Sequence, residues 1–291
     1  MTRQEHSIPK MAATWLLPVV TLIVASSSGG LLSHAFMPVS TTIALLTSAF
    51  SFSMVIIGLS FAIMMITVYL LRLITSGPPD PALILSAFIT LGPLGQGGFS
   101  LLVNGQDLSE LLPLHMGETF PTIQLAGQMI FAGCFLGAYV LFSMGVAWIL
   151  LAVISIGHVR STHNLPFSMA YWGLIFPNGV FALLCVQLAK VLDSPVFRVI
   201  GAAWTGTSRP AHSPSVRRPR ATDSSCASAG IVFLLWITVF LRSIPAFIDG
   251  SMFKAPYVPD EPAPSKKGVF DPEKMEGFGS HATSAATVIA I

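Results

Sequence analysis

Charged side chains are scarce in this sequence, and their scarcity decides the class of protein. Asp, Glu, Lys and Arg make up 10% of the 291 residues, whereas hydrophobic types make up 53%. Soluble domains carry about 25% charged residues, which form the polar surface that keeps them in solution. The net charge of +2 is too small for the basic surface that nucleic-acid binding needs. We therefore predict an integral membrane protein with no nucleic-acid partner.

Cysteines are few, and motifs of catalysis are absent. Cys134, Cys185 and Cys226 are far apart, with no CxxC spacing and no Cys/His cluster, so neither a disulfide framework nor a metal site is supported. No phosphate loop, GxSxG, HExxH or dinucleotide fingerprint occurs. We expect a protein that is not an enzyme and that needs no metal or other cofactor.

What the sequence does contain is a series of long apolar runs. Each has about the 20 residues or more that a helix needs to cross the hydrocarbon, and none alternates as barrel strands do. We predict an all-α integral membrane fold of about six transmembrane helices in three hairpins, at residues 14–33, 41–71, 82–103, 124–157, 166–189 and 229–248. The fourth is long enough to tilt strongly or overhang the bilayer.

Lys and Arg outside these spans predict the orientation. Nine of them fall on the side that holds both termini and six on the other, and four of those six lie in the segment 205–228. Leaving that segment aside, the positive-inside rule places both termini in the cytosol. We predict a cytosolic segment 1–13, a transmembrane domain 14–248 and a disordered cytosolic tail 249–291. The loop 104–121, acidic and without Lys or Arg, is expected outside.

The segment 205–228 is rich in Ser, Pro and Arg and is unlike its surroundings. It is either a disordered extracellular loop or an artefact of the gene model, such as translated intron. Its charge opposes the positive-inside rule, which favours the artefact.

Prolines alternate between the spans. Pro18, Pro93 and Pro177 lie in the first, third and fifth, whereas the second and fourth have none and the sixth has only Pro245 near its end. Proline kinks a helix and leaves a carbonyl that needs a partner from protein or water. The spans hold no Asp, Glu, Lys or Arg well inside them. We therefore expect the odd spans to line a neutral path for an anion, with helix packing as the alternative.

Two further patterns can each be interpreted either as part of an anion path or as helix packing. The run GPLGQGG at residues 92–98 could expose backbone dipoles to an anion or allow close helix packing; packing is the expected role of each serine in the run SSS at 26–28. Phe176 beside the proline of the fifth span could gate a narrow pore, although such a Phe is more often lipid-facing or in a core. Tyr171 and Trp172 are expected as interface anchors or pore residues.

Four segments resemble the tellurite-resistance/dicarboxylate transporter family, also called slow-type voltage-dependent anion channels. They are TWLLPVVTLIVASSSGG from Thr14, GPLGQGGF from Gly92, FSMAYWGLIFPNGVFAL from Phe167 and DSPVFRVIGAAW from Asp193. Within the family the closest likeness is to fungal sulfite efflux pumps, with malic-acid transporters next. The resemblance implies ten helices in five hairpins, odd helices around a pore, a gate at Phe176, and homotrimers.

On this basis we expect a plasma-membrane anion transporter that exports sulfite. Its path residues are predicted to be Pro18, Gly92, Pro93, Gly95, Gln96, Gly97 and Pro177. Carriage of a C4-dicarboxylate such as malate is the alternative. The likeness covers only the last six of the ten family helices, so a chain truncated at its N-terminus, and a fragment that does not transport, are also expected alternatives.

Overall fold

The structure is a computed structural model that describes residues 13–77, 84–117, 122–162, 167, 169–205 and 230–250. All of these belong to one compact unit, Met1–Phe253. Almost all of the predicted segment 1–13, the atypical segment from residue 206 onward and the tail from residue 251 lie outside the described residues. The predictions made for those parts therefore stay predictions.

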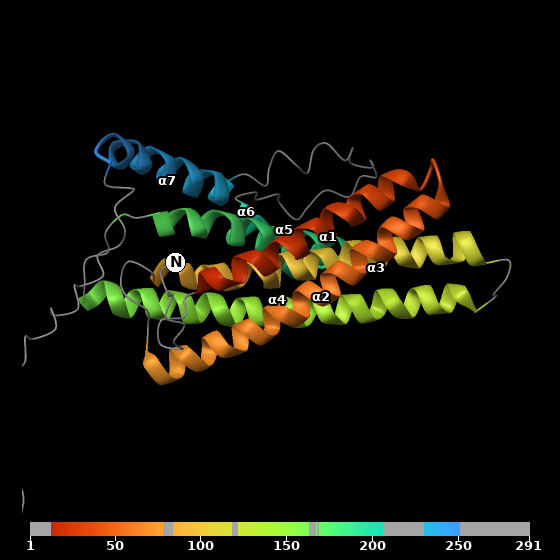
Figure 1. Cartoon of the computed structure of the whole chain (residues 1–291), viewed down its shortest axis with the longest axis horizontal. Coiled ribbons are helices and arrows are strands. Elements are labelled where there is room, and N and C mark those ends of the chain that lie inside the picture. Colours follow the sequence, from red (N-terminus) through yellow and green to blue (C-terminus); the bar gives the residue numbers. More distant parts are fainter. Residues whose placement is uncertain are drawn as a thin grey trace, which may run out of the picture. The chain divides into compact units, whose positions relative to one another are not determined.

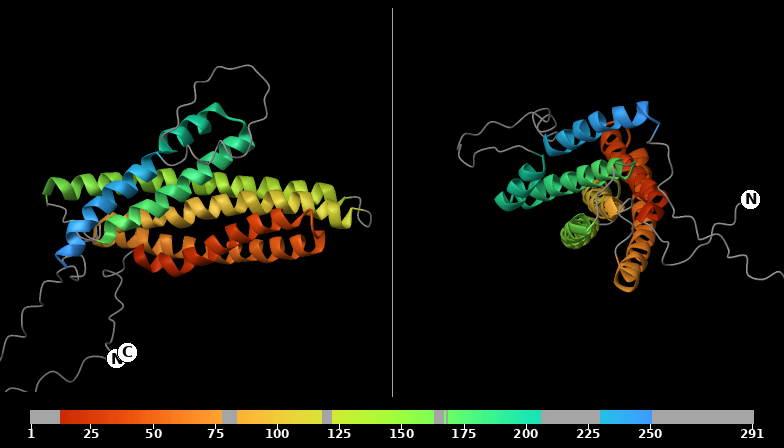
Figure 2. Two further views of the ribbon diagram at one scale, coloured as in Figure 1. Left: turned by 90° about the horizontal axis from the view of Figure 1, so that it is seen from above. Right: turned by 90° about the vertical axis from the view of Figure 1, so that its left-hand side faces the viewer.

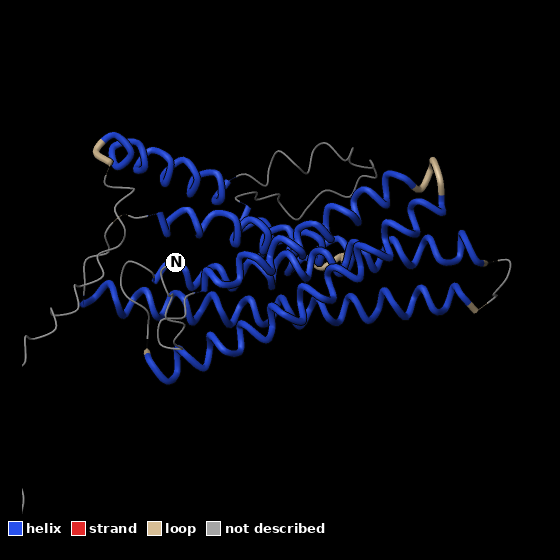
Figure 3. The backbone as a smooth tube through the Cα atoms, in the orientation of Figure 1, coloured by secondary structure: helices blue, strands red, loops and turns tan. Residues whose placement is uncertain are grey.

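The described residues are helical, with short loops and no strand among them (Figure 3). With η for a 3₁₀ helix, the elements are η2 (Ala13–Leu16), α1 (Leu17–Phe36), α2 (Thr41–Ser76), η3 (Ile84–Thr90), α3 (Leu91–Met116), α4 (Ile123–Thr162), η4 (Met169–Leu174), α5 (Ile175–Leu192), α6 (Pro195–Thr205) and α7 (Gly230–Ile248).

Five helical spans are long and apolar enough to cross a membrane, and α7 adds a shorter apolar helix, Val232–Ile248. The spans are Ala13–Phe36, Thr41–Ser76, Ile84–Met116, Ile123–Ser161 and Tyr171–Leu192. The predicted all-α membrane fold is confirmed, and this is a multi-pass membrane protein. At 1.5 Å per residue, α2 and α4 are about 54 and 60 Å long, so they must tilt or extend beyond a hydrocarbon core of about 30 Å.

The third span forms the centre of the helix packing. Of its most apolar window, 89% is buried, against 33% for the second span and 28% for the fourth. Helices α1, α2, α4 and α5 all pack against α3. The end-on view in Figure 2 shows α3 between α1 and α2 on one side and α4 and α5 on the other, and Figure 1 gives the same helices from the side.

Glycines let α3 approach its neighbours closely. A Cβ atom built on Gly98 would lie 2.8 Å from Cδ2 of Leu184 in α5, and one built on Gly105 would lie 2.7 Å from Cβ of Cys134 in α4. Both distances are too short for a real Cβ contact. Small residues at such positions allow the close van der Waals packing that holds membrane helices together.

Each odd span is broken in the same way. A 3₁₀ segment (η2, η3 or η4) passes directly into an α-helix whose second or third residue is Pro18, Pro93 or Pro177. The prolines expected to interrupt these spans thus lie in the first turn of an α-helix that follows a 3₁₀ segment. Proline in a first turn is well tolerated because its missing N–H belongs to the groups without an intrahelical partner. The even spans are continuous α-helices of 36 and 40 residues, so the predicted alternation of broken and intact spans is found.

The third span is longer than predicted. Helix α3 continues to Met116, so most of the expected outside loop 104–121 is helical, and its residues 118–121 lie outside the described part of the chain. The polar residues Asn104 and Asp107, which suggested a loop, are buried on one side of this helix. Polarity concentrated on one helical face does not end a helix when that face has partners.

Helix α6 was not predicted. Its residue Phe197 packs against α4, where its ring meets that of Phe142 edge-on with centroids 5.1 Å apart. The ring of Tyr139 is also close, at 6.2 Å. This aromatic contact joins α6 to α4, and α6 also packs against α5.

Candidate functional site

The breaks in the three odd spans meet around Gly92, in the first turn of α3. A Cβ built on Gly92 would lie 3.8 Å from Cε1 of Phe176, 4.0 Å from Cγ of Pro177 and 4.0 Å from Cγ2 of Val20. Val20 is in the first turn of α1, and the other two residues are in the first turn of α5. We call the group Val20, Gly92, Phe176 and Pro177 the junction.

Phe176 differs from its neighbours in the junction because its side chain is 46% exposed. Pro177 and Asn178, which follow it, are buried. The side-chain amide of Asn178 donates from Nδ2 to the carbonyl of Leu174 at 2.7 Å, across the change from η4 to α5. This bond holds the Asn178 side chain against the carbonyl of Leu174, the residue directly before α5.

Gly95 and Gly97 lie at contacts between helices. A Cβ on Gly95 would be 2.7 Å from the backbone nitrogen of Phe181 in α5, and one on Gly97 would overlap Leu59 in α2. Pro93 is buried beside them. The structure therefore shows packing at these positions, and a role for them in lining a path stays a prediction.

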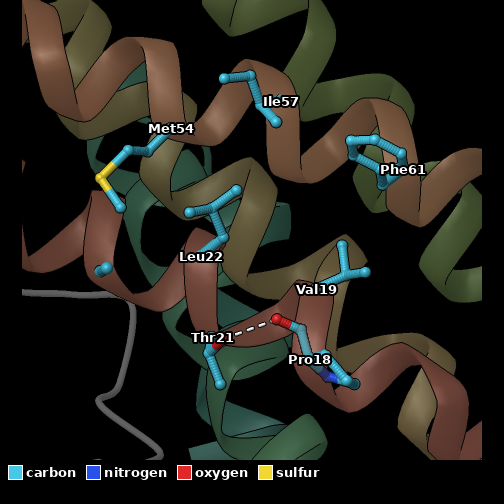
Figure 4. A pocket seen from close by; sticks show the side chains of 8 residues that line it. Pro18, Val19, Thr21, Leu22, Met54, Ile57 and Phe61 are labelled. Atoms are coloured by element: carbon cyan, nitrogen blue, oxygen red, sulfur yellow. Dashed lines mark hydrogen bonds between the residues drawn. The ribbon is translucent and has the colours of Figure 1, made fainter.

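Pro18 lies apart from the junction. It is exposed and borders an open groove of about 420 Å³ between α1 and α2 (Figure 4). The groove is otherwise lined by Val19, Thr21, Leu22, Ala25, Met54, Ile57 and Phe61. The hydroxyl of Thr21 donates to the carbonyl of Pro18 at 2.7 Å. The wall is mostly apolar, so the groove has few groups with which to bind an anion.

Gln96 begins a line of polar contacts between α1 and α3, which we call the polar ladder. Its α3 members are Gln96, Ser100, Asn104 and Asp107, all buried. They are spaced by four, four and three residues, which places them on one helical face. That face is turned toward α1.

The lower rungs of the polar ladder are hydrogen bonds to serines. Gln96 donates from Nε2 to Oγ of Ser27. The hydroxyls of Ser26 and Ser100 are 2.7 Å apart, and Asn104 donates from Nδ2 to the carbonyl of Ser100 at 2.9 Å. A buried amide at mid-span is tolerated because these partners satisfy its donor.

Ser26 also connects α1 to α2 through hydrogen bonds. Its hydroxyl lies 2.6 Å from the carbonyl of Ser51, and the hydroxyl of Ser51 donates back to the carbonyl of Ser26. Gly29 leaves room for Ser51, and Gly30 leaves room for the amide of Asn104, 3.2 Å from where a Cβ would be. The run SSSGG is thus a packing motif.

The last rung is an ionisable pair at the far end of the polar ladder. Nδ1 of His34 in α1 is 3.5 Å from Oδ1 of Asp107 in α3. Both Asn104 and Asp107 were missed by the sequence analysis because the third span was ended at Val103. The four-four-three spacing that continues from Gln96 is the signal that could have extended the helix.

The junction itself is uncharged. Within the described parts of the five spans the charged residues are Arg72, Asp107, Glu110, Arg160 and Lys190, and none is among the nearest neighbours of Gly92. The described residues hold no group of three or more His, Cys, Asp or Glu that could bind a metal ion. An anion at the junction would meet backbone, aromatic and aliphatic groups.

Comparison with known proteins fits this arrangement. Residues 1–208 match the family described as voltage-dependent anion channel. The chain belongs to this family. The resemblance inferred from the sequence is thereby confirmed, and the family is one of transporters and channels.

Several relatives carry the name "Sulfite efflux pump SSU1". The protein of that name from Trichophyton rubrum is 31% identical over 206 residues, which is 70% of this chain and 52% of the relative. The one from Candida albicans is 29% identical over 212 residues, 67% of this chain and 42% of the relative, and the one from Saccharomyces cerevisiae is 26% identical over 229 residues. The chain thus spans about half the length of these relatives. No solved structure matches it significantly.

Proposed function

We propose that this member of the voltage-dependent anion channel family carries sulfite out of the cell across the plasma membrane. The observation that carries the proposal is the position of Gly92 between Phe176 and Pro177 of α5 and Val20 of α1. Three broken helices of one membrane domain meet there, and the residues at their meeting point are uncharged. The names of the relatives support sulfite as the anion.

In this proposal Phe176 is the gate. Its partly exposed ring lies near Gly92, which presents no side chain to it. With the ring in place the passage is closed by exclusion, and with the ring displaced an anion passes. The path would run past Pro18, Gly92, Pro93, Gly95, Gln96, Gly97 and Pro177.

The driving force would be the electrochemical gradient of the anion, with no chemical step and no cofactor. A moving anion would be stabilised by helix dipoles and hydroxyls rather than by a fixed positive charge. A site without a buried cation releases an anion readily, which suits flux more than tight binding.

Three hairpins enclose such a path only together with other helices. We propose that these come from a longer form of this chain or from a second chain, and that the assembled protein is a homotrimer with both termini in the cytosol. The proposal concerns that assembly, because this chain spans about half of its relatives.

Sulfite flux through purified protein in liposomes tests the proposal. The expected result is saturable sulfite efflux that follows an imposed membrane potential and exceeds that of empty liposomes. Competition by malate separates the two anions: strong inhibition would assign a dicarboxylate carrier. Absence of any anion flux from correctly folded protein would identify a fragment that does not transport.

A further inference from the structure

We propose that Asp107 of α3 and His34 of α1 form a proton-binding site, in which the pair holds one exchangeable proton inside the membrane domain. The proposal goes beyond anion transport and does not depend on it. It starts from the finding that an acidic residue is buried in the central helix, where the sequence had predicted none.

The geometry leaves the carboxyl group of Asp107 only partly satisfied. The residue is 3% exposed. Its Oδ1 faces Nδ1 of His34 at 3.5 Å, and its Oδ2 has no hydrogen-bond partner among the described residues. One turn earlier, Oδ1 of Asn104 is also buried, and the described residues offer it no donor. Two acceptor oxygens are therefore buried here without a donor.

A bare carboxylate at this position would be strongly disfavoured. Moving an ionised group out of water costs far more free energy than a single weak contact provides. The cost is avoided if Asp107 is a neutral acid, or if it is ionised beside a protonated His34. Both forms contain one proton, shared by the pair, and loss of that proton leaves a buried negative charge.

Among the described residues, His34 and Glu110 are the charged or ionisable side chains that act on Asp107, and no Lys or Arg does. Glu110, one turn along α3 and exposed, adds a like charge that acts on Asp107. The charged residues of α2 and α4 are Arg72 and Arg160, near the ends of those helices that are remote from Asp107, and His158 is close to the latter. On α5, Lys190 lies in the last turn and is exposed.

His34 provides a route for exchange. Its side chain is 64% exposed, whereas that of Asp107 is 4% exposed. Imidazole changes charge near neutral pH more readily than any other side chain. A proton can thus reach the buried carboxyl group through the ring. When the proton binds or leaves, the net charge between α1 and α3 changes by one. Asp107 lies about 16 Å along α3 from Gln96.

Magnetic resonance of the protein in liposomes, with labelled His and Asp, tests the proposal. The ring of His34 and the carboxyl carbon of Asp107 are followed over a pH range. In the wild-type pair, we expect the last proton to leave at a pH about one unit or more above the pH at which His34 titrates in Asp107→Asn. One pH unit corresponds to a tenfold difference in proton affinity. The last proton of the wild-type pair should also leave at a higher pH than the Asp107 proton in His34→Gln.

The matched control is Glu110→Gln, which removes an exposed carboxyl group from the next turn and should leave the proton with the pair. If Asp107→Asn fails to fold, His34→Gln decides alone, because it alters an exposed side chain. The proposal is overturned if Asp107 is ionised at every pH and His34 titrates identically with and without it. None of these outcomes depends on sulfite flux.

Discussion

Gly95 of α3 lies directly against the backbone of Phe181 in α5. A Cβ on Gly95 would be 2.7 Å from the nitrogen and 2.8 Å from the Cα of Phe181. Backbone atoms cannot turn aside as the end of a side chain can. Gly95 therefore sets the separation of the two helices, and with it the position of Phe176, about 7.5 Å back along α5.

A methyl group at this contact should be costly. We expect Gly95→Ala to lower the free energy of unfolding by about 1–3 kcal/mol, as overpacking does, or to push α3 and α5 apart. Thermal unfolding in detergent measures the loss. The matched control is Gly133→Ala in α4, where a Cβ would meet no atom within 4 Å and alanine favours the helix by up to about 1 kcal/mol. Equal effects of the two variants would show that the contact is not tight.

Ser26 should matter far more than its neighbour Ser28. The hydroxyl of Ser26 connects α1 to Ser51 and Ser100, whereas that of Ser28 donates to Val24 of its own helix at 3.1 Å. We expect Ser26→Ala to cost about 1 kcal/mol of stability, the size of interhelical hydrogen bonds in membranes. Ser28→Ala should cost much less, and a larger loss there would contradict the polar ladder. Thermal unfolding of both variants in one detergent gives the comparison.

Helix α6 should depend on one aromatic side chain. Phe197→Ala removes the ring that packs on Phe142, and a buried Phe replaced by Ala typically costs about 3–5 kcal/mol. We expect early local exposure of α6, measured as faster amide hydrogen exchange over Pro195–Thr205. Val199→Ala on the same helix, at a side chain 67% exposed, is the control. Unchanged exchange in Phe197→Ala would mean that α6 is held elsewhere.

A negative charge at the start of the polar ladder should oppose an anion. Gln96→Glu keeps the size of the side chain but replaces the Nε2 donor to Ser27 by a carboxyl oxygen, at a buried site within the membrane. We expect several-fold slower sulfite efflux from liposomes. The control is Gln106→Glu, the same change at an exposed position of α3, which should leave the flux near that of the wild type. Equal flux in both variants would place the path away from Gln96.

The sequence predicted the spans well because continuous apolarity is a direct signal of a membrane helix. It failed where polar residues continued a helix: Asn104 and Asp107 resemble loop residues until their partners Ser26 and His34 are known. It also failed for α6, which is too short for a span and is held by Phe197 through contacts distant in the sequence.

For the candidate site, the sequence predicted which helices would be broken but not how. The prolines mark the breaks, yet the 3₁₀ segments before them depend on packing. Nothing local indicated that Phe176 would lie over Gly92 while Pro18 lies in a groove beside α2. Phe176 and Gly92 are 84 positions apart in the sequence, and the groove at Pro18 is formed with residues of α2, so only the packing of the helices creates these contacts.

The gate is tested most directly by comparing two variants of α5 in liposomes. Phe176→Ala and Leu183→Ala each remove a large side chain of similar exposure, 46% and 44%, from the same helix. We predict that Phe176→Ala raises sulfite flux by about tenfold or more, equivalent to a barrier lowered by ~1.4 kcal/mol, while Leu183→Ala leaves it near the wild-type rate. Equal flux in wild type and both variants, with the fold intact, would contradict a pore closed by Phe176.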